Sequence, residues 1–261
     1  MSIDTSRRAL FKKAGVASAA MLGSPFAFAA GIPAKTVEKY DETFDVVVIG
    51  SGFAGLACAL KAGRGGKKVL VIEKMTVLGG NSAICGGNVA CAVNPVQKAQ
   101  GIKDSKELFI EDCLKDGLGI NHTELLATIA DRCNDTIKMV EDLGCEFVPN
   151  KMLFEGGHSV PRSYEIKAGS GSGYIRPMLA ALEKEPNVTI RAKTKFDDFI
   201  VDDDNNVVGI VCRENYRFNT KLTSDDLENK TGKKKVIRAT KGVMLAAGGF
   251  SRDTWFRQIQ D

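Results

Sequence analysis

The sequence predicts an α/β fold, in which strands and helices alternate around a parallel sheet. Three observations support this prediction. Residues 46–49 are all Val or Ile, and a short apolar run of this kind is typical of a buried strand. The glycine-rich turn Gly50–Gly55 follows directly and leads into an apolar helix. Lys68–Ile72 then predicts a second buried strand, which is followed by Glu73. A strand, glycine turn, helix, strand and acid in this order indicate a unit that binds a dinucleotide.

The small residues of the first turn each have an expected part in binding. Gly50 permits a tight turn, Gly52 lets the backbone approach a diphosphate, and Gly55 lets the helix pack closely on the strand. The helix start, with Ala54, would face phosphates because its N–H groups and dipole favour negative charge. Glu73 would accept hydrogen bonds from ribose hydroxyls, which argues against a ribose that carries a 2′-phosphate. A glycine turn alone also occurs in other α/β domains, so the flanking strands and the spaced acid carry the prediction.

A second glycine-rich loop follows Glu73 and favours a flavin over a nicotinamide cofactor. A nicotinamide site usually continues from its acid into another crossover helix, whereas here Gly79–Gly80 and then Gly86–Gly87 come at once. These glycines could let the main chain follow a diphosphate and leave room for a flat ring system. Asn81 and Ser82 supply short polar side chains between the two pairs. Two such loops indicate a longer cofactor.

The end of the chain repeats the pattern of a strand followed by glycine. Lys241–Phe250 predicts a buried strand that runs into a turn at Ala247 and Gly248. Each glycine pair alone is more often a turn than a ligand contact, and it is their joint order that indicates one binding site.

Together these motifs resemble the flavoprotein family of fumarate reductases and succinate dehydrogenases. More narrowly, the chain is similar to the soluble periplasmic flavocytochrome c type and to its relatives that reduce urocanate or methacrylate. The resemblance covers residues 44–261 and implies a Rossmann-like FAD-binding domain of the glutathione-reductase type. It is carried by Gly50–Gly55, Glu73–Lys74, Gly79–Ser82, Gly86–Gly87, His158–Arg162 and Ala246–Phe250.

The resemblance also implies which residues contact FAD. Ala247 stands where family members usually have Thr, so a hydroxyl near the cofactor is missing. Ser82 stands in the region of the histidine that holds flavin covalently in the membrane-bound members, so FAD is expected without a covalent link. The strand end near Lys195 and Phe196 is expected beside the adenine. The expected FAD-binding residues are Gly50, Gly52, Ala54, Gly55, Glu73, Lys74, Asn81, Ser82, Gly86, Gly87, Phe196, Ala247 and Gly248.

The reaction that the resemblance implies is the reduction of a double bond next to a carboxylate. The expected substrate is a small unsaturated carboxylate, and the expected electron donor is a cytochrome c or a quinol-linked partner. In the family, the substrate-capping domain begins about where this chain stops, and the arginine that protonates the substrate lies beyond that point. We therefore expect an incomplete domain that lacks the cap, and no catalytic residue is assigned. A fragment, an interrupted reading frame and one piece of a split protein remain open.

Two other functions fit the same motifs. The chain could belong to another enzyme that uses this flavin fold, such as a dehydrogenase of ketosteroid type or an amino-acid oxidase. It could also be a catalytically inactive subunit that binds flavin or carries electrons. Substrate assays on the complete reading frame would distinguish the first alternative from a reductase of unsaturated carboxylates. A flavin spectrum without turnover would identify the second alternative.

The first thirty residues predict a twin-arginine signal peptide and therefore a periplasmic location. Ser6–Lys13 contains the paired arginines, the apolar residues 14–28 follow, and Ala27–Ala29 has the form of a cleavage site. The apolar stretch is too short for a stable membrane span, which needs about 20 apolar residues. The alternative is an amphipathic N-terminal helix or anchor. Residues 31–43 are expected to form a linker, and residues 44–261 the N-terminal part of the FAD-binding domain.

Charge and cysteine spacing exclude several other classes. The formal net charge is +4, and residues 1–30 carry +3 of it, so no basic surface for nucleic acid is indicated. The seven cysteines include no C-x-x-C-H for attached haem and no paired C-x-x-C units for zinc or iron–sulfur. With only two histidines, a metal site is not expected. A haem that feeds electrons to the flavin would belong to another chain.

Between the glycine loops, the sequence predicts ordinary α/β elements. Asp104–Glu107 has the form of a capping box that opens a helix running to about Lys115. Thr123 can cap a longer helix. The polar residues 168–173 form either a simple linker or a loop that closes over the flavin or substrate.

Two further features concern a hairpin and an arginine. Phe196–Val201 and Val207–Cys212 predict a hairpin. Its acidic turn, residues 202–206, lacks the spaced ligands of an EF-hand loop and is expected to be a solvated turn. Arg162, on a loop beside Pro161, is either a surface or structural ion-pair residue or helps to position an anionic group.

Overall fold

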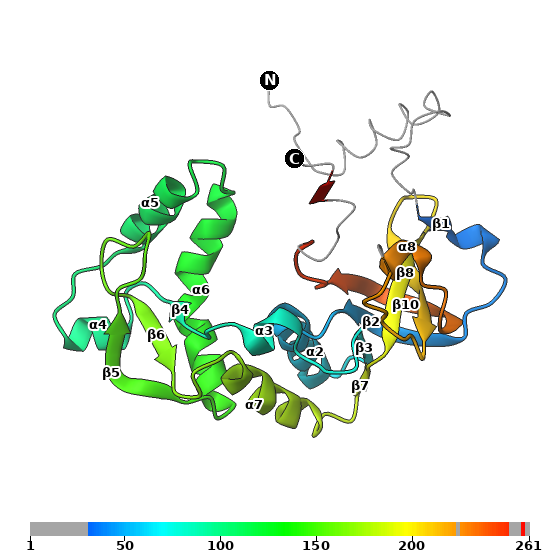
Figure 1. Cartoon of the computed structure of the whole chain (residues 1–261), viewed down its shortest axis with the longest axis horizontal. Coiled ribbons are helices and arrows are strands. Elements are labelled where there is room, and N and C mark those ends of the chain that lie inside the picture. The colour runs from blue at the N-terminus through cyan, green and yellow to red at the C-terminus, as the bar shows by residue number, and fades with distance from the viewer. Residues whose placement is uncertain (1–30, 223–224, 251–256, 259–261) are drawn as a thin grey trace.

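The computed structural model describes residues 31–222, 225–250 and 257–258, and the predicted signal peptide, residues 1–30, lies outside them (Figure 1). The chain forms two lobes, one built on a seven-stranded sheet and one on a three-stranded sheet. The sheet lobe contains β1 (Ile32–Pro33), the 3-10 helix η2 (Ala34–Thr36), β2 (Glu42–Ile49), α2 (Phe53–Arg64), β3 (Val69–Ile72), α7 (Ser172–Leu182), β7 (Val188–Arg191), β8 (Thr194–Val201), β9 (Val207–Glu214), α8 (Asp225–Glu228) and β10 (Lys233–Leu245). The helical lobe contains β4 (Val89–Ala90), α4 (Pro95–Ala99), α5 (Lys106–Asp116), α6 (Thr123–Asp142), β5 (Phe147–Leu153) and β6 (Ser163–Ile166), and α3 (Gly80–Ile84) lies between the lobes.

The larger sheet confirms the predicted α/β fold. Its strands run in the order β1-β8-β9-β10-β2-β3-β7. Neighbours among β10, β2, β3 and β7 are parallel, whereas β8 and β9 form an antiparallel hairpin that pairs with the first half of β10. Ile49 lies opposite Ile72, so β2 and β3 end at the same edge of the sheet. Both predicted glycine loops begin at this edge, where ligands bind in folds of this kind.

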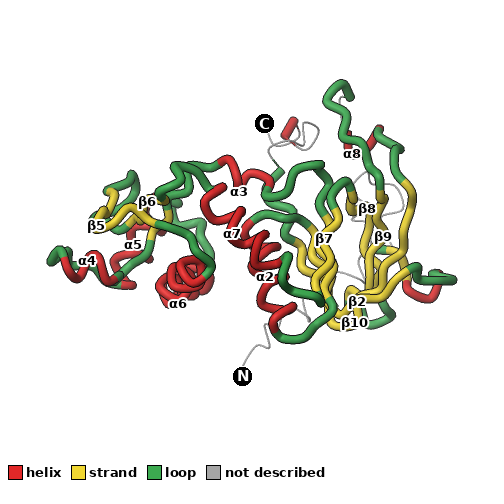
Figure 2. The backbone as a smooth tube through the Cα atoms, turned by 90° about the horizontal axis from the view of Figure 1, so that it is seen from below, coloured by secondary structure: helices red, strands yellow, loops and turns green. Residues whose placement is uncertain are grey.

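The two faces of the parallel strands are covered by different elements. Helices α2 and α7 cover one face through a buried cluster that includes Val48, Leu56 and Met178. On the other face, Leu70 and Ile210 belong to a cluster that packs β2 and β3 against the β8–β9 hairpin. Figure 2 shows this hairpin facing the parallel strands, and β9 joins them by pairing with β10. Burial on both faces explains why β2 and β3 read as continuous apolar runs.

Local signals placed the helices of the other lobe correctly, but their caps differ from the prediction. The cap of α5 is Ser105, whose Oγ accepts the N–H of Leu108 at 3.0 Å, so Asp104 does not begin a capping box. Thr123 is the first helical residue of α6, and His122 holds the cap position without a side-chain hydrogen bond. A complete capping box does occur at the start of α4.

Two connecting segments are more ordered than the sequence indicated. The expected linker, residues 31–43, contributes β1, in which Ile32 pairs with Ile200 of β8. The polar segment 168–173 leads directly into α7 and is held against the second glycine loop. The N–H of Gly171 in this segment donates to the carbonyl of Cys85 at 2.8 Å. The β8–β9 hairpin forms as predicted, although each strand is two residues longer.

Candidate cofactor-binding site

The first glycine turn is held by backbone contacts that only glycine allows. Gly50 has a φ of 103°, and a Cβ atom there would lie 2.3 Å from the carbonyl oxygen of Ala246. A Cβ atom at Gly55 would lie 2.0 Å from the carbonyl oxygen of Gly50. At Gly52, by contrast, a Cβ atom would contact only Ser82. Gly50 and Gly55 are therefore required by packing, whereas Gly52 keeps the backbone open on one side.

The start of α2 presents amide hydrogens without protein acceptors. The N–H of Phe53 donates to Ser82 Oγ at 3.1 Å. Within the described ranges, the N–H groups of Ala54 and Gly55 have no hydrogen-bond acceptor. Because unpaired amides and the helix dipole favour anions, this helix start fits a diphosphate. It is the place where the sequence predicted one.

The predicted acid lies directly beside this turn and is only 8% exposed. Oε2 of Glu73 accepts the Ser51 hydroxyl at 2.6 Å and the Ser51 N–H at 3.1 Å. Its Oε1 accepts the N–H of Met75 at 2.8 Å. A carboxylate has about four acceptor positions, so Oε1 keeps capacity for one more hydrogen bond. The acid can therefore bind a ribose hydroxyl, as its position after β3 predicts.

The second glycine loop lies against the first and continues into the short helix α3. The N–H of Gly79 donates to Ser51 Oγ at 2.9 Å, and Ser82 of α3 accepts the N–H of Phe53. No acceptor among the described residues pairs with the N–H groups of Gly80 and Asn81. Helices α2 and α3 thus begin side by side, each with unpaired amides (Figure 1).

The pair Gly86–Gly87 has two different environments. Gly86 is exposed, and a Cβ atom there would meet no other atom within 4 Å. A Cβ atom at Gly87 would lie 2.6 Å from Ile166, and its carbonyl accepts the hydroxyl of Tyr174 at 2.7 Å. Burial raises the pKa of Tyr174, which keeps this donor protonated. Packing against the helical lobe accounts for Gly87, while Gly86 leaves the open space expected beside a ring.

The predicted turn after β10 lies next to the glycine turn after β2. The N–H of Ala246 donates to the carbonyl of Ile49 at 2.8 Å, which brings Ala247 next to Gly50, and Gly248 follows in the chain. The preceding strand end is not buried as expected, since the side chain of Leu245 is 56% exposed. This end of β10 pairs with β2 on one side, and its pairing with β9 stops at residue 238.

Two predicted residues lie to the side of the glycine loops. The Lys74 ammonium lies over the ring of Phe218, 5.4 Å from its centroid. The ring of Phe196 packs on Phe199 at a centroid distance of 4.6 Å and belongs to the edge of the core. The backbone of β8 nevertheless adjoins the acid, because the N–H of Thr194 donates to the carbonyl of Glu73 at 2.8 Å.

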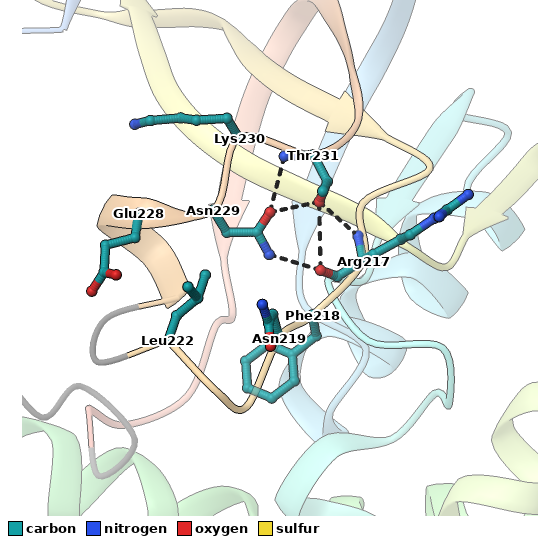
Figure 3. A pocket seen from close by; sticks show the side chains of 8 residues that line it. All are labelled: Arg217, Phe218, Asn219, Leu222, Glu228, Asn229, Lys230 and Thr231. Atoms are coloured by element: carbon teal, nitrogen blue, oxygen red, sulfur yellow. Dashed lines mark hydrogen bonds between the residues drawn. The ribbon is translucent and has the colours of Figure 1, made fainter.

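A pocket of about 430 Å³ lies beyond Lys74, in the connection between β9 and β10 (Figure 3). Asn229 organises its wall by bonding to the carbonyl of Arg217 and to Thr231, and the Phe218 ring closes its lower side in the view shown. None of the glycine-loop residues lines this pocket. Its lining residues are Arg217, Phe218, Asn219, Leu222, Glu228, Asn229, Lys230 and Thr231.

Arg162 is a structural ion-pair residue and is buried, not on the surface. Its guanidinium pairs with Asp104 and Asp112 at 2.9 Å each, and its side chain is 0% exposed. Burial alone would raise the pKa of Asp112, but hydrogen bonds from Ser159 and the charge of Arg162 hold it below its usual value. The arginine lies in the helical lobe, and both of its terminal nitrogens contact buried groups there, which supports the structural ion-pair role.

Sequence reasoning missed Ser51, the residue that joins the two glycine loops to the acid. The available signal was a hydroxyl residue between Gly50 and Gly52, which predicts a hydrogen bond within or next to the turn.

Over the described parts of the chain, no cluster of three or more metal-ligating side chains occurs, and no helix is long and apolar enough to cross a bilayer.

Comparisons with known proteins agree with this geometry. The FAD binding domain family matches residues 45–261. The acrylate reductase flavoprotein subunit of Shewanella woodyi is 39% identical over 98% of this chain and 48% of its own length. The urocanate reductase of Eggerthella lenta is 34% identical over 82% of this chain and 33% of its own length. The open conformation of a flavocytochrome c3 fumarate reductase aligns with a TM-score of 0.69 and 30% identity, over 81% of this chain and 34% of that one.

These matches cover most of this chain but only a third to a half of each relative. The matched region holds both glycine loops, the acid and the turn after β10. The chain therefore belongs to the FAD-binding domain family and is a relative of the acrylate, urocanate and fumarate reductase flavoproteins.

Proposed function

We propose that this chain is the FAD-binding portion of an exported reductase that acts on small unsaturated carboxylates. One observation carries the proposal: α2 and α3 begin side by side with unpaired amides, next to a buried acid that keeps one free acceptor position. A diphosphate with a ribose on one side matches this arrangement of donors and acceptor. The similarity to acrylate, urocanate and fumarate reductases supports the substrate class.

Each part of the site has a separate task in holding the cofactor. The amides of Ala54 and Gly55 would bind the diphosphate, and Glu73 would bind the adenosine ribose. The exposed Gly86 and the turn at Ala247–Gly248 would leave space for the flat ring against the backbone. Bound FAD supplies hydride transfer at its ring, and these residues orient it.

Non-covalent attachment is part of the proposal. The Ser82 hydroxyl, which stands in the region of the flavin-linking histidine of the membrane-bound enzymes, is engaged with the N–H of Phe53. Both histidines of the chain, His122 and His158, lie in or beside the helical lobe. Acid precipitation of flavin-loaded protein should therefore release all of the FAD into the supernatant. Yellow colour retained in the pellet would contradict this.

Ligand titration of the full chain tests the cofactor site. FAD should bind and raise the melting temperature, whereas NADP should do neither, because Glu73 disfavours a 2′-phosphate. Glu73→Gln should weaken FAD binding, and the control Glu107→Gln, at an exposed acid of α5, should leave it unchanged. Folded protein that takes up no FAD, or that prefers NADP, would overturn the proposal.

Turnover tests the substrate class and the electron donor. A longer reading frame that carries this chain should reduce acrylate, fumarate or urocanate when a reduced viologen dye replaces the cytochrome or quinol-linked donor. Oxidation of a ketosteroid or an amino acid instead would assign the alternative dehydrogenase or oxidase. Flavin binding without any turnover would assign an electron-carrying subunit.

Export to the periplasm rests on residues 1–30. A reporter fused behind this segment should reach the bacterial periplasm through twin-arginine export. Replacing Arg7 and Arg8 by Lys should abolish export, because the pathway reads the arginine pair. Export that survives this double change would contradict the twin-arginine assignment.

A further inference from the structure

Ser51 connects three segments that are distant in the sequence. Ser51 lies between Gly50 and Gly52 in the sequence, and it is 0% exposed to solvent. The hydroxyl donates to Oε2 of Glu73 at 2.6 Å and accepts the N–H of Gly79 at 2.9 Å. The turn after β2, the acid after β3 and the loop before α3 therefore meet at one oxygen atom.

The same residue determines which oxygen of the acid remains available. Oε2 of Glu73 receives both the hydroxyl and the N–H of Ser51, so its two acceptor positions are filled. Oε1 receives only the N–H of Met75 and keeps one position. The carboxylate is thus oriented before any ligand arrives, and a ligand hydroxyl can bond to Oε1 alone.

We infer that Ser51 is a positioning residue for cofactor recognition. It does not contact the cofactor, because its side chain is fully buried and its hydroxyl is engaged on both sides. It directs Oε1 of Glu73 towards one hydroxyl of the adenosine ribose, and it holds the start of α3 in register with the start of α2. The inference rests on FAD binding at this site and goes beyond it by assigning how the ribose is selected.

Ribose analogues of ADP, the adenosine half of FAD, test this role in the full chain. Isothermal titration should show that ADP binds about tenfold more tightly than one of its two analogues, 2′-deoxy-ADP or 3′-deoxy-ADP, and about as tightly as the other, since only one of them loses the charged hydrogen bond. In Ser51→Ala this preference should shrink towards one, and the Kd for FAD should rise about tenfold. The matched control is Ser163→Ala, because Ser163 is also 0% exposed and its hydroxyl has no partner among the described residues.

A double-mutant cycle separates positioning from simple stabilisation. In the Glu73→Gln background, Ser51→Ala should leave the ratio of ADP to deoxy-ADP affinities unchanged, because the acid that Ser51 orients is already altered. If Ser51→Ala lowers only the melting temperature and keeps the wild-type ratio, the inference is wrong. Should Ser51→Ala fail to fold, Ser51→Cys, with a weaker donor, should show a reduced ratio, and an unchanged ratio would refute the inference. Wild-type protein that binds neither FAD nor ADP would instead refute the cofactor site itself.

Discussion

At the scale of single residues, buried charge is concentrated at Arg162. Its guanidinium touches Asp104 and Asp112, lies 5.3 Å from the centroid of the Phe109 ring and leaves Nε without a partner in the described structure. Asp104 precedes α5, Asp112 lies within it, and Arg162 comes from the loop before β6. Removing one partner of a buried ion pair costs far more than the intact pair contributes. This cluster is therefore where a single substitution should weaken the helical lobe most.

Arg162→Met should lower the free energy of unfolding by about 3–5 kcal/mol, because it leaves two buried carboxylates without a counter-charge. Urea denaturation followed by circular dichroism measures the change. The control is Arg132→Met, which breaks an exposed pair with Asp135 and should cost about 0.5 kcal/mol or less. Equal stability of Arg162→Met and the wild type would show that the cluster is not needed for folding.

His158 gives the same cluster a dependence on pH. Burial, and then the nearby Arg162 charge, lower the pKa of His158 from its ordinary value of 6.5. Its Nδ1 lies 3.3 Å from Nη1 of Arg162, and since a guanidinium only donates, this nitrogen accepts and the ring is neutral. The unfolded chain takes up a proton near pH 6.5, whereas the folded protein does so only at lower pH. The free energy of unfolding should therefore fall as the pH falls below about 6.5.

Urea titrations between pH 7.5 and about 5.5 measure this slope above the range in which most carboxylates titrate. His158→Gln should flatten the slope, because the replacement cannot be protonated. His122→Gln, at the cap of α6, serves as the control and should keep the slope. A wild-type slope that survives His158→Gln would assign the pH dependence to other groups.

At the scale of elements, the approach of α2 to β2 depends on Gly55. With only 2.0 Å between a Cβ atom there and the carbonyl of Gly50, Gly55→Ala must push the helix away from the strand. We expect a loss of about 3 kcal/mol in the free energy of unfolding, at the upper end for overpacking, and loss of FAD binding. Thermal melts with and without FAD measure both.

The control for this substitution is Gly156→Ala. A Cβ atom there would meet no other atom within 4 Å, so the melting temperature should stay close to that of the wild type. If Gly55→Ala melts like Gly156→Ala, close packing of α2 on β2 is not what the glycine provides.

Element positions could be predicted from the sequence because their signals are local. The apolar runs before Gly50 and Glu73 depend on neighbouring residues only, and they match the structure. The partners of Ser51 and Arg162 could not be predicted, because each bonds to residues 22 to 58 positions away and such pairings require the tertiary fold. Ala247 and Gly248 were predicted from their order in the chain, and the structure explains why Ala247 lies close to Gly50: Ala246, directly after β10, donates its N–H to the carbonyl of Ile49 in β2.

At the scale of the whole molecule, the candidate site lies on the sheet lobe, close to its junction with the helical lobe. Figure 1 shows α3 between the two lobes, and α7 packs on both α2 and α3. Tyr174 of α7 bonds to Gly87 at the start of the helical lobe. A ligand bound at the starts of α2 and α3 would therefore stabilise this junction, which the end of α6 also contacts, while α5 and the first half of α6 lie further from it.

Hydrogen exchange should reveal this uneven effect of the cofactor. The N–H groups of Ala54, Gly55 and Gly80 now lack protein acceptors, and bonds to a diphosphate would protect them. At FAD concentrations about 100 times the Kd, exchange that requires release of the ligand should slow by about a hundredfold. Amides within α5 and the first half of α6 should change little, because these segments lie away from the junction and their hydrogen bonds are already formed within the helices. Mass spectrometry of peptides from the two regions measures the difference. Protection spread evenly over both lobes, or confined to α5 and α6, would place the ligand elsewhere.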